Sequence, residues 1–131
     1  MTEQYGFNKQ VTGSFEQVIE NVTAALKGQG FGVLTTIDIQ TTFKKKLDVD
    51  MGRYMILGAC NPKLAYSALQ TDVEIGLLLP CNVIVYENDD AAVTVSIVDP
   101  EIMLGVVDVP ALKAVALEAK TKLENALSAL D

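Results

Sequence analysis

Gly58-Ala59-Cys60-Asn61-Pro62 and Leu79-Pro80-Cys81-Asn82-Val83 are the two stretches that decide the fold of this chain. Residues 53–60 and 81–87 are rich in apolar and aromatic side chains, and each predicts a strand that one of these stretches ends or begins. In the first stretch, Asn followed by Pro is a strong helix start, since Asn is a favoured N-cap and Pro suits the first helical turn. If the two strands are antiparallel neighbours, both Cys-Asn steps lie at one corner of a sheet.

Outward from this corner, the hydrophobic periodicity predicts the other elements. Strands are expected at residues 7–11, 31–37, 53–60, 81–87 and 91–99, with helices opened by Ser14, Asp38, Asn61-Pro62 and Asp108-Pro110, a turn at 88–90 and a loop over 100–109. Strands that alternate with helices, together with one hairpin, indicate an α+β sheet with its helices on one face. The length of 131 residues suits a single domain spanning residues 1–131.

Composition excludes several classes of function. The chain has no His, which rules out Ser-His-Asp triads, Cys-His dyads and His-bound zinc. The net charge of −7 disfavours nucleic acid as a partner, because a phosphate backbone requires a basic footprint. The one basic run, Lys44-Lys45-Lys46, is interpreted either as a solvated helix face or as a patch that contacts anions.

The N-terminal residues and the lengths of the apolar runs bear on the cellular location of the protein. The opening residues lack the basic and apolar regions of a signal peptide, and no apolar run is long enough to span a membrane. We therefore expect a cytoplasmic protein with reduced cysteines and without a membrane partner.

The two Cys-Asn stretches also carry a family resemblance. Together with Val85-Tyr86-Glu87, Gly30-Phe31-Gly32-Val33-Leu34 and residues 44–47, they resemble the prokaryotic family known as domain of unknown function 302, over nearly the whole chain. The resemblance implies a fold like one repeat of the TATA-box-binding protein: a curved, mostly antiparallel five-stranded sheet in the order strand, helix, four strands, helix, with short helices in the connections. It also implies a homodimer. The family has no assigned activity, so no catalytic residue is carried over.

Four residues are the candidate binding site: Cys60, Asn61, Cys81 and Asn82. Cys60 is also the one candidate nucleophile, because a thiolate beside a helix N-terminus is stabilised and its pKa is lowered. Alternatively, both cysteines are small buried core residues, and both Asn side chains are capping and turn groups. We expect no metal and no cofactor, since two thiolates are only half of a tetrahedral zinc set.

The sequence therefore leaves three classes of function open. The favoured hypothesis is a homodimeric module that binds or senses a small molecule near the Cys-Asn steps, because no catalytic constellation is recognisable. The alternatives are a thiol-based enzyme or redox protein that uses Cys60, and a purely structural or interaction protein.

Overall fold

The computed structural model describes residues 4–88, 90 and 92–131, and contains a five-stranded antiparallel sheet. The strands are β1 (Gly6–Val11), β2 (Gly32–Asp38), β3 (Tyr54–Cys60), β4 (Cys81–Glu87) and β5 (Val93–Val98). Their order across the sheet is β1-β5-β4-β3-β2, and each neighbouring pair is antiparallel. Strands β3 and β4, which end and begin at the two Cys-Asn steps, are thus neighbours. The predicted α+β class is confirmed.

The helices follow the start signals of the sequence in three of the predicted cases. They are α1 (Phe15–Gly28), α2 (Ile39–Leu47), α3 (Pro62–Thr71), a 3₁₀-helix η1 (Val73–Leu78), α4 (Pro100–Leu104) and α5 (Pro110–Ser128). Side chains of Ser14, Asp38 and Asn61 each accept a hydrogen bond from the backbone N–H three residues later, at 3.0 to 3.2 Å. None of the described helices combines the length and hydropathy that a membrane crossing requires.

The connection between β5 and the last helix differs from the prediction. Half of the expected loop is helix α4, which Asp99 caps by accepting from the Glu101 N–H at 2.9 Å, with Pro100 in its first turn. The N-cap of α5 is Val109 rather than Asp108, and no side chain caps it. Asp99 and Pro100 are thus the start signal of a helix that the hydrophobic pattern alone did not predict. The predicted turn at 88–90 includes residue 89, which lies outside the described residues.

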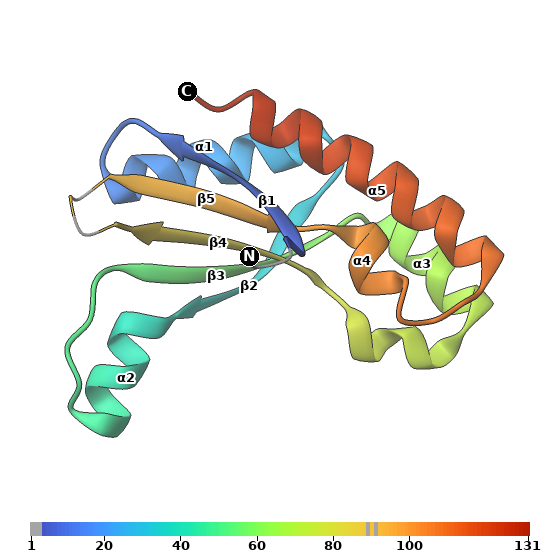
Figure 1. Cartoon of the computed structure of the whole chain (residues 1–131), viewed down its shortest axis with the longest axis horizontal. Helices are drawn as coiled ribbons and strands as arrows, with labels where there is room; N and C mark the ends of the chain where they lie inside the picture. The colour runs from blue at the N-terminus through green and yellow to red at the C-terminus, as the bar shows by residue number, and fades with distance from the viewer. Residues whose placement is uncertain (1–3, 89, 91) are drawn as a thin grey trace.

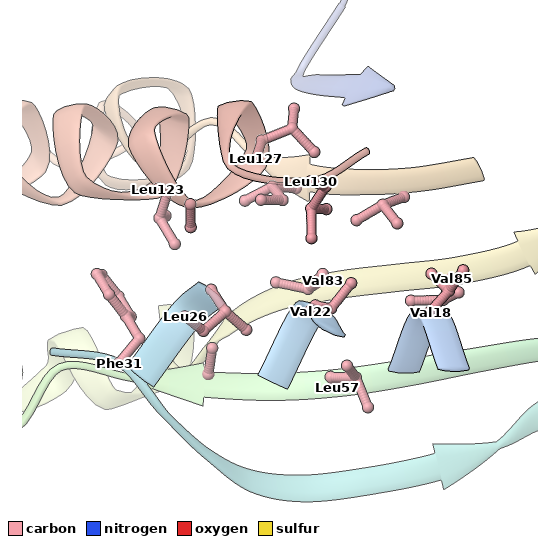
Figure 2. Close-up of a cluster of buried hydrophobic side chains, with 14 of the residues drawn as sticks. Val18, Val22, Leu26, Phe31, Leu57, Val83, Val85, Leu123, Leu127 and Leu130 are labelled. Atoms are coloured by element: carbon pink, nitrogen blue, oxygen red, sulfur yellow. The ribbon is translucent and has the colours of Figure 1, made fainter. Parts of the chain in front are cut away.

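Helices α1 and α5 cover one face of the sheet (Figure 1) and form the main core there. Val18, Val22 and Leu26 of α1 point toward Val83 and Val85 of β4, as Figure 2 shows. The labelled members of this core from the other elements are Phe31, Leu57, Leu123, Leu127 and Leu130. A smaller cluster centred on Ile75 and Leu112 joins η1, α3, α4 and α5 beyond the end of the sheet.

The short helix α2 stands apart from this core (Figure 1). None of its residues is buried. Lys44 forms ion pairs with Asp48 and Asp50 at 3.0 and 3.1 Å, so part of the basic run is neutralised by its own loop. We call the face of β5, β4 and β3 opposite to α1 and α5 the open face. Its side chains are mostly half-buried, but Asn82 is exposed and Thr94 is buried.

Candidate functional site

The register of β3 and β4 brings the two cysteines to one corner of the sheet. Ala59 is the register partner of Cys81. Cys60 is the next residue along β3 and therefore lies diagonally across from Cys81. The α-carbons of such a diagonal pair lie roughly 6 Å apart in an antiparallel sheet. Both cysteines line a small cavity bordered by α3, α4 and α5, and both are free thiols.

The cavity at this corner is too small for an organic ligand. Its volume is about 30 Å³, the space of a single water molecule, and its walls are almost wholly apolar. Phe31, Leu64 and Met103 are among the side chains around it. A cavity of this kind is a packing gap of the core, so Cys81, which is 7% exposed, lies there as a small apolar residue.

The environment of both thiols opposes ionisation. Burial, with a smaller contribution from the neighbouring Cys60, raises the pKa of Cys81 to about 11. Burial also raises the pKa of the Cys60 thiol, so the expectation of a lowered pKa at the helix start is wrong. The physical reason is burial at the end of a strand, and the side-chain carbonyl oxygen that accepts from the Leu64 N–H of the helix is that of Asn61.

Asn61 has a structural task at the same corner. Its Oδ1 accepts from the Leu64 N–H at 3.2 Å, and its Nδ2 lies 3.1 Å from the point where a Cβ at residue 30 would be. Gly30 has a φ of +82°, a backbone conformation that favours glycine. The Asn61 side chain that caps α3 therefore packs against the turn at Gly30, which follows α1.

Asn82 is not among the described residues of the cavity that Cys60, Asn61 and Cys81 line. Because side chains alternate along β4, Cys81 faces the core and Asn82 lies on the open face, where it is exposed. There it borders a groove of about 580 Å³. The groove is lined by Gln4, Tyr5, Gly6, Asn8, Tyr54, Asn82, Ile84, Tyr86, Ser96, Ile97 and Val98.

Two tyrosines form the aromatic part of this groove. Tyr54 of β3 pairs in register with Tyr86 of β4, and their rings stack with centroids 5.7 Å apart and an interplanar angle of 16°. Burial is the main cause that raises the pKa of Tyr54, and the neighbouring Tyr86 adds to it. The sequence prediction missed this pair as a site. The alternation of Asn82, Ile84 and Tyr86 along one strand face was the signal that could have found it.

Charged side chains lie elsewhere in the described part of the chain. Arg53 pairs with Glu16 at 2.7 Å and lies over the ring of Phe15, which places it against α1. Lys120 pairs with Asp99 and Glu101, each at 3.1 Å, and so joins α5 to α4. Among the described residues, no three His, Cys, Asp or Glu side chains gather in a set that could hold a metal ion.

Comparisons with known proteins agree on one family. The model of the family described as "Domain of unknown function DUF302" matches residues 7–130. The chain is also similar to a solved structure, the crystal structure of an uncharacterised conserved DUF302 protein from Bacillus stearothermophilus. The two are 26% identical, with a TM-score of 0.91 over 98% of this chain and 100% of that one.

No curated protein shows significant sequence similarity to this chain. The expected likeness to one repeat of the TATA-box-binding protein stays a prediction. The family match covers nearly the whole chain, and the structural match extends over the same elements. The chain therefore belongs to the DUF302 family of domains of unknown function.

Proposed function

We propose that this protein is a binding module for small molecules, and that the ligand lies in the groove on the open face of the sheet. The observation that carries the proposal is the groove itself. Its volume of about 580 Å³ falls within the range of roughly 300–1,000 Å³ that is typical of ligand pockets. Apolar side chains such as Ile84 and Val98 are interspersed there with a few polar ones.

The chemistry of the two candidate sites favours the groove, rather than the corner with the cysteines, as the ligand site. A thiol acts as a nucleophile in its thiolate form, and burial raises the pKa of both Cys60 and Cys81. The thiol-based alternative thus loses its main support. Of the four residues predicted from the sequence, Asn82 is the one that borders the groove.

The proposal includes a homodimer. Five apolar side chains of β2 and the α2 region are exposed: Leu34, Ile37, Phe43, Leu47 and Val49. Strand β2 is also an edge strand, whose outer backbone groups have no partner within the sheet. A second copy that covers this region would leave the groove accessible. The two free thiols favour a reducing, cytoplasmic location.

Native mass spectrometry of freshly purified protein tests the binding function. We expect wild-type protein to carry a small molecule that is released on denaturation. Ser96→Trp, which places a large ring in the groove, should lose it, whereas Cys60→Ala should retain it. A wild-type protein without any bound small molecule, or a Ser96→Trp variant that still carries one, would count against the proposal.

A further inference from the structure

We infer that the groove on the open sheet face selects an uncharged, flat heteroaromatic compound. The ring would stack on the Tyr54–Tyr86 pair, and its polar edge would meet Asn8, Asn82 and Ser96. This inference rests on the proposed function, and it names the class of ligand that the groove accepts. Three properties of the groove carry it: the uncharged side chains of its described lining, the stacked tyrosines and the position of the polar side chains.

The charge argument comes from the lining itself. None of the eleven described residues that line the groove is Asp, Glu, Lys, Arg or His. A charged group that leaves water requires an opposite charge as its partner, and this lining offers none. The net charge of −7 further disfavours an anion. The cation nearest along β1, Lys9, does not change this, because it donates a hydrogen bond to the Leu130 carbonyl at the end of α5.

The tyrosine pair favours a flat ring. The two rings are nearly parallel, with an interplanar angle of 16°, and they come from residues directly opposite each other on β3 and β4. A third planar π-system extends such a stack, whereas a saturated ring has no π-face to offer. Because burial and its neighbour raise the pKa of Tyr54, that side chain stays neutral at physiological pH.

The polar side chains lie beside this stack on the same sheet face. Asn8 and Ser96 are register partners on β1 and β5, and Ser96 pairs in turn with Ile84 of β4. Asn82 is two residues before Ile84 and therefore shares its face. In the described part of the chain, none of Asn8, Asn82 and Ser96 uses its side chain in a hydrogen bond to another residue.

These free groups match the edge of a heterocycle. An Asn side chain has both donors and acceptors, and it pairs with neighbouring ring nitrogen and amino or carbonyl groups. A hydroxyl such as that of Ser96 donates or accepts as required. The groove therefore combines a stacking surface with neutral hydrogen-bonding groups, and it lacks the ionic contacts that an acid or an amine would need.

A fragment screen by nuclear magnetic resonance on the ¹⁵N-labelled full chain tests the inference. The set contains equal numbers of neutral heteroaromatic fragments, aromatic carboxylates, aromatic amines and neutral saturated rings. We expect the fragments that shift β4 and β5 amides around the groove to be mainly neutral heteroaromatics. Tyr86→Leu should weaken their binding by about ten-fold, as loss of one stacking partner does.

Two further variants serve as a control and as a second test of the groove. Tyr66→Leu is the matched control, because Tyr66 is exposed on α3 and does not border the groove; it should bind like wild type. Asn82→Ala should weaken the same fragments without loss of folding, since Asn82 is exposed. If charged or saturated fragments bind the groove equally well, the ligand class is wrong and the groove stands. If no fragment shifts the groove amides, both this inference and the proposed function fall.

Discussion

At the scale of single residues, Cys81 shows how burial alone sets chemistry. Its thiol lies in a nearly dry, apolar corner, where an ionised sulfur would lack any compensating partner. The pKa of about 11 is consequently far above the ordinary thiol value of about 8.5. Cys81, a binding-site candidate in the sequence, is thus held in its protonated, apolar form.

This pKa predicts a dependence of stability on pH. Between pH 8.5 and 11, roughly, the folded protein keeps the Cys81 proton while the unfolded chain loses it, so the free energy of unfolding falls as pH rises. The loss is about 1.4 kcal/mol per pH unit at most. The Cys81→Ala variant does not lose stability in this way, but the cavity that the substitution creates lowers its free energy of unfolding by about 1 kcal/mol at pH 7.5. Urea denaturation should therefore show that wild type is more stable than the variant at pH 7.5 and less stable by pH 10.5. A difference in the free energy of unfolding that is constant with pH would contradict the buried thiol.

Gly58 has a different constraint, which is space on the open face. A Cβ at this position would overlap Oγ1 of Thr35 and lie 2.9 Å from Cγ of Pro80. The hydroxyl of Thr35 can rotate away, but the ring of Pro80 is fixed by the chain that leads into β4. The absence of a side chain at Gly58 thus allows β2 and the start of β4 to approach β3 closely.

Gly58→Ala should therefore destabilise the protein by about 2 kcal/mol through steric overlap. The matched control is Gly28→Ala at the end of α1, where a Cβ meets nothing within 4 Å. That change should stabilise by about 0.5 kcal/mol, because Ala restricts the unfolded chain and favours helix. Chemical denaturation of both variants tests this. Equal effects at the two glycines would show that crowding at Gly58 is not the cause.

At the scale of elements, the two Cys-Asn steps have opposite roles. The first one ends a strand and begins a helix, so its Asn caps α3. The second one begins a strand, so its Asn lies on the open sheet face and binds no neighbouring backbone group among those described. Similar short sequences therefore serve different purposes because the element that follows each one differs.

Paired substitutions separate these two roles. Asn61→Ala should cost about 1 kcal/mol of stability through loss of the helix cap. Asn82→Ala should change stability by less than about 0.5 kcal/mol, as exposed substitutions do. Thermal or urea denaturation measures both. A large destabilisation by Asn82→Ala would mean that this residue is part of the fold rather than of the groove.

At the scale of the whole molecule, the uncovered apolar side chains of β2 and the α2 region call for a partner. Helix α2 places Phe43 and Leu47 in solvent, although both fall at helical spacing on one side. The edge strand β2 lies next to them in sequence. Exposed apolar groups beside a free strand edge are typical of a surface that pairs with another chain.

We expect light scattering to show a homodimer at tens of micromolar, a concentration at which modest dimers persist. Leu47→Glu should shift the protein to monomer, because it places a charge in the contact. Leu77→Glu is the control, since Leu77 is even more exposed, on η1, away from this region. A wild-type monomer would remove the dimer from the proposal, and a dimeric Leu47→Glu variant would exclude this surface.

Periodicity and capping residues predicted most of the elements, because both signals are local. The start of α3 at Asn61-Pro62 and all five strands are recognisable from a few neighbouring residues. The short helix α4 and the 3₁₀-helix η1 were missed, since neither is long enough to show a period; α4 packs against α5, and η1 packs against α3 and α4.

The sequence by itself determined the α+β class, the family and the meeting of Cys60 and Cys81 at one corner, since these follow from motifs and strand order. Only the tertiary structure decided that burial keeps both thiols protonated and that Asn82 belongs to a groove with Tyr54 and Tyr86. Those properties depend on which side chains meet across strands that are distant in sequence. Register and burial are set by the packed sheet as a whole, so no local pattern contains them.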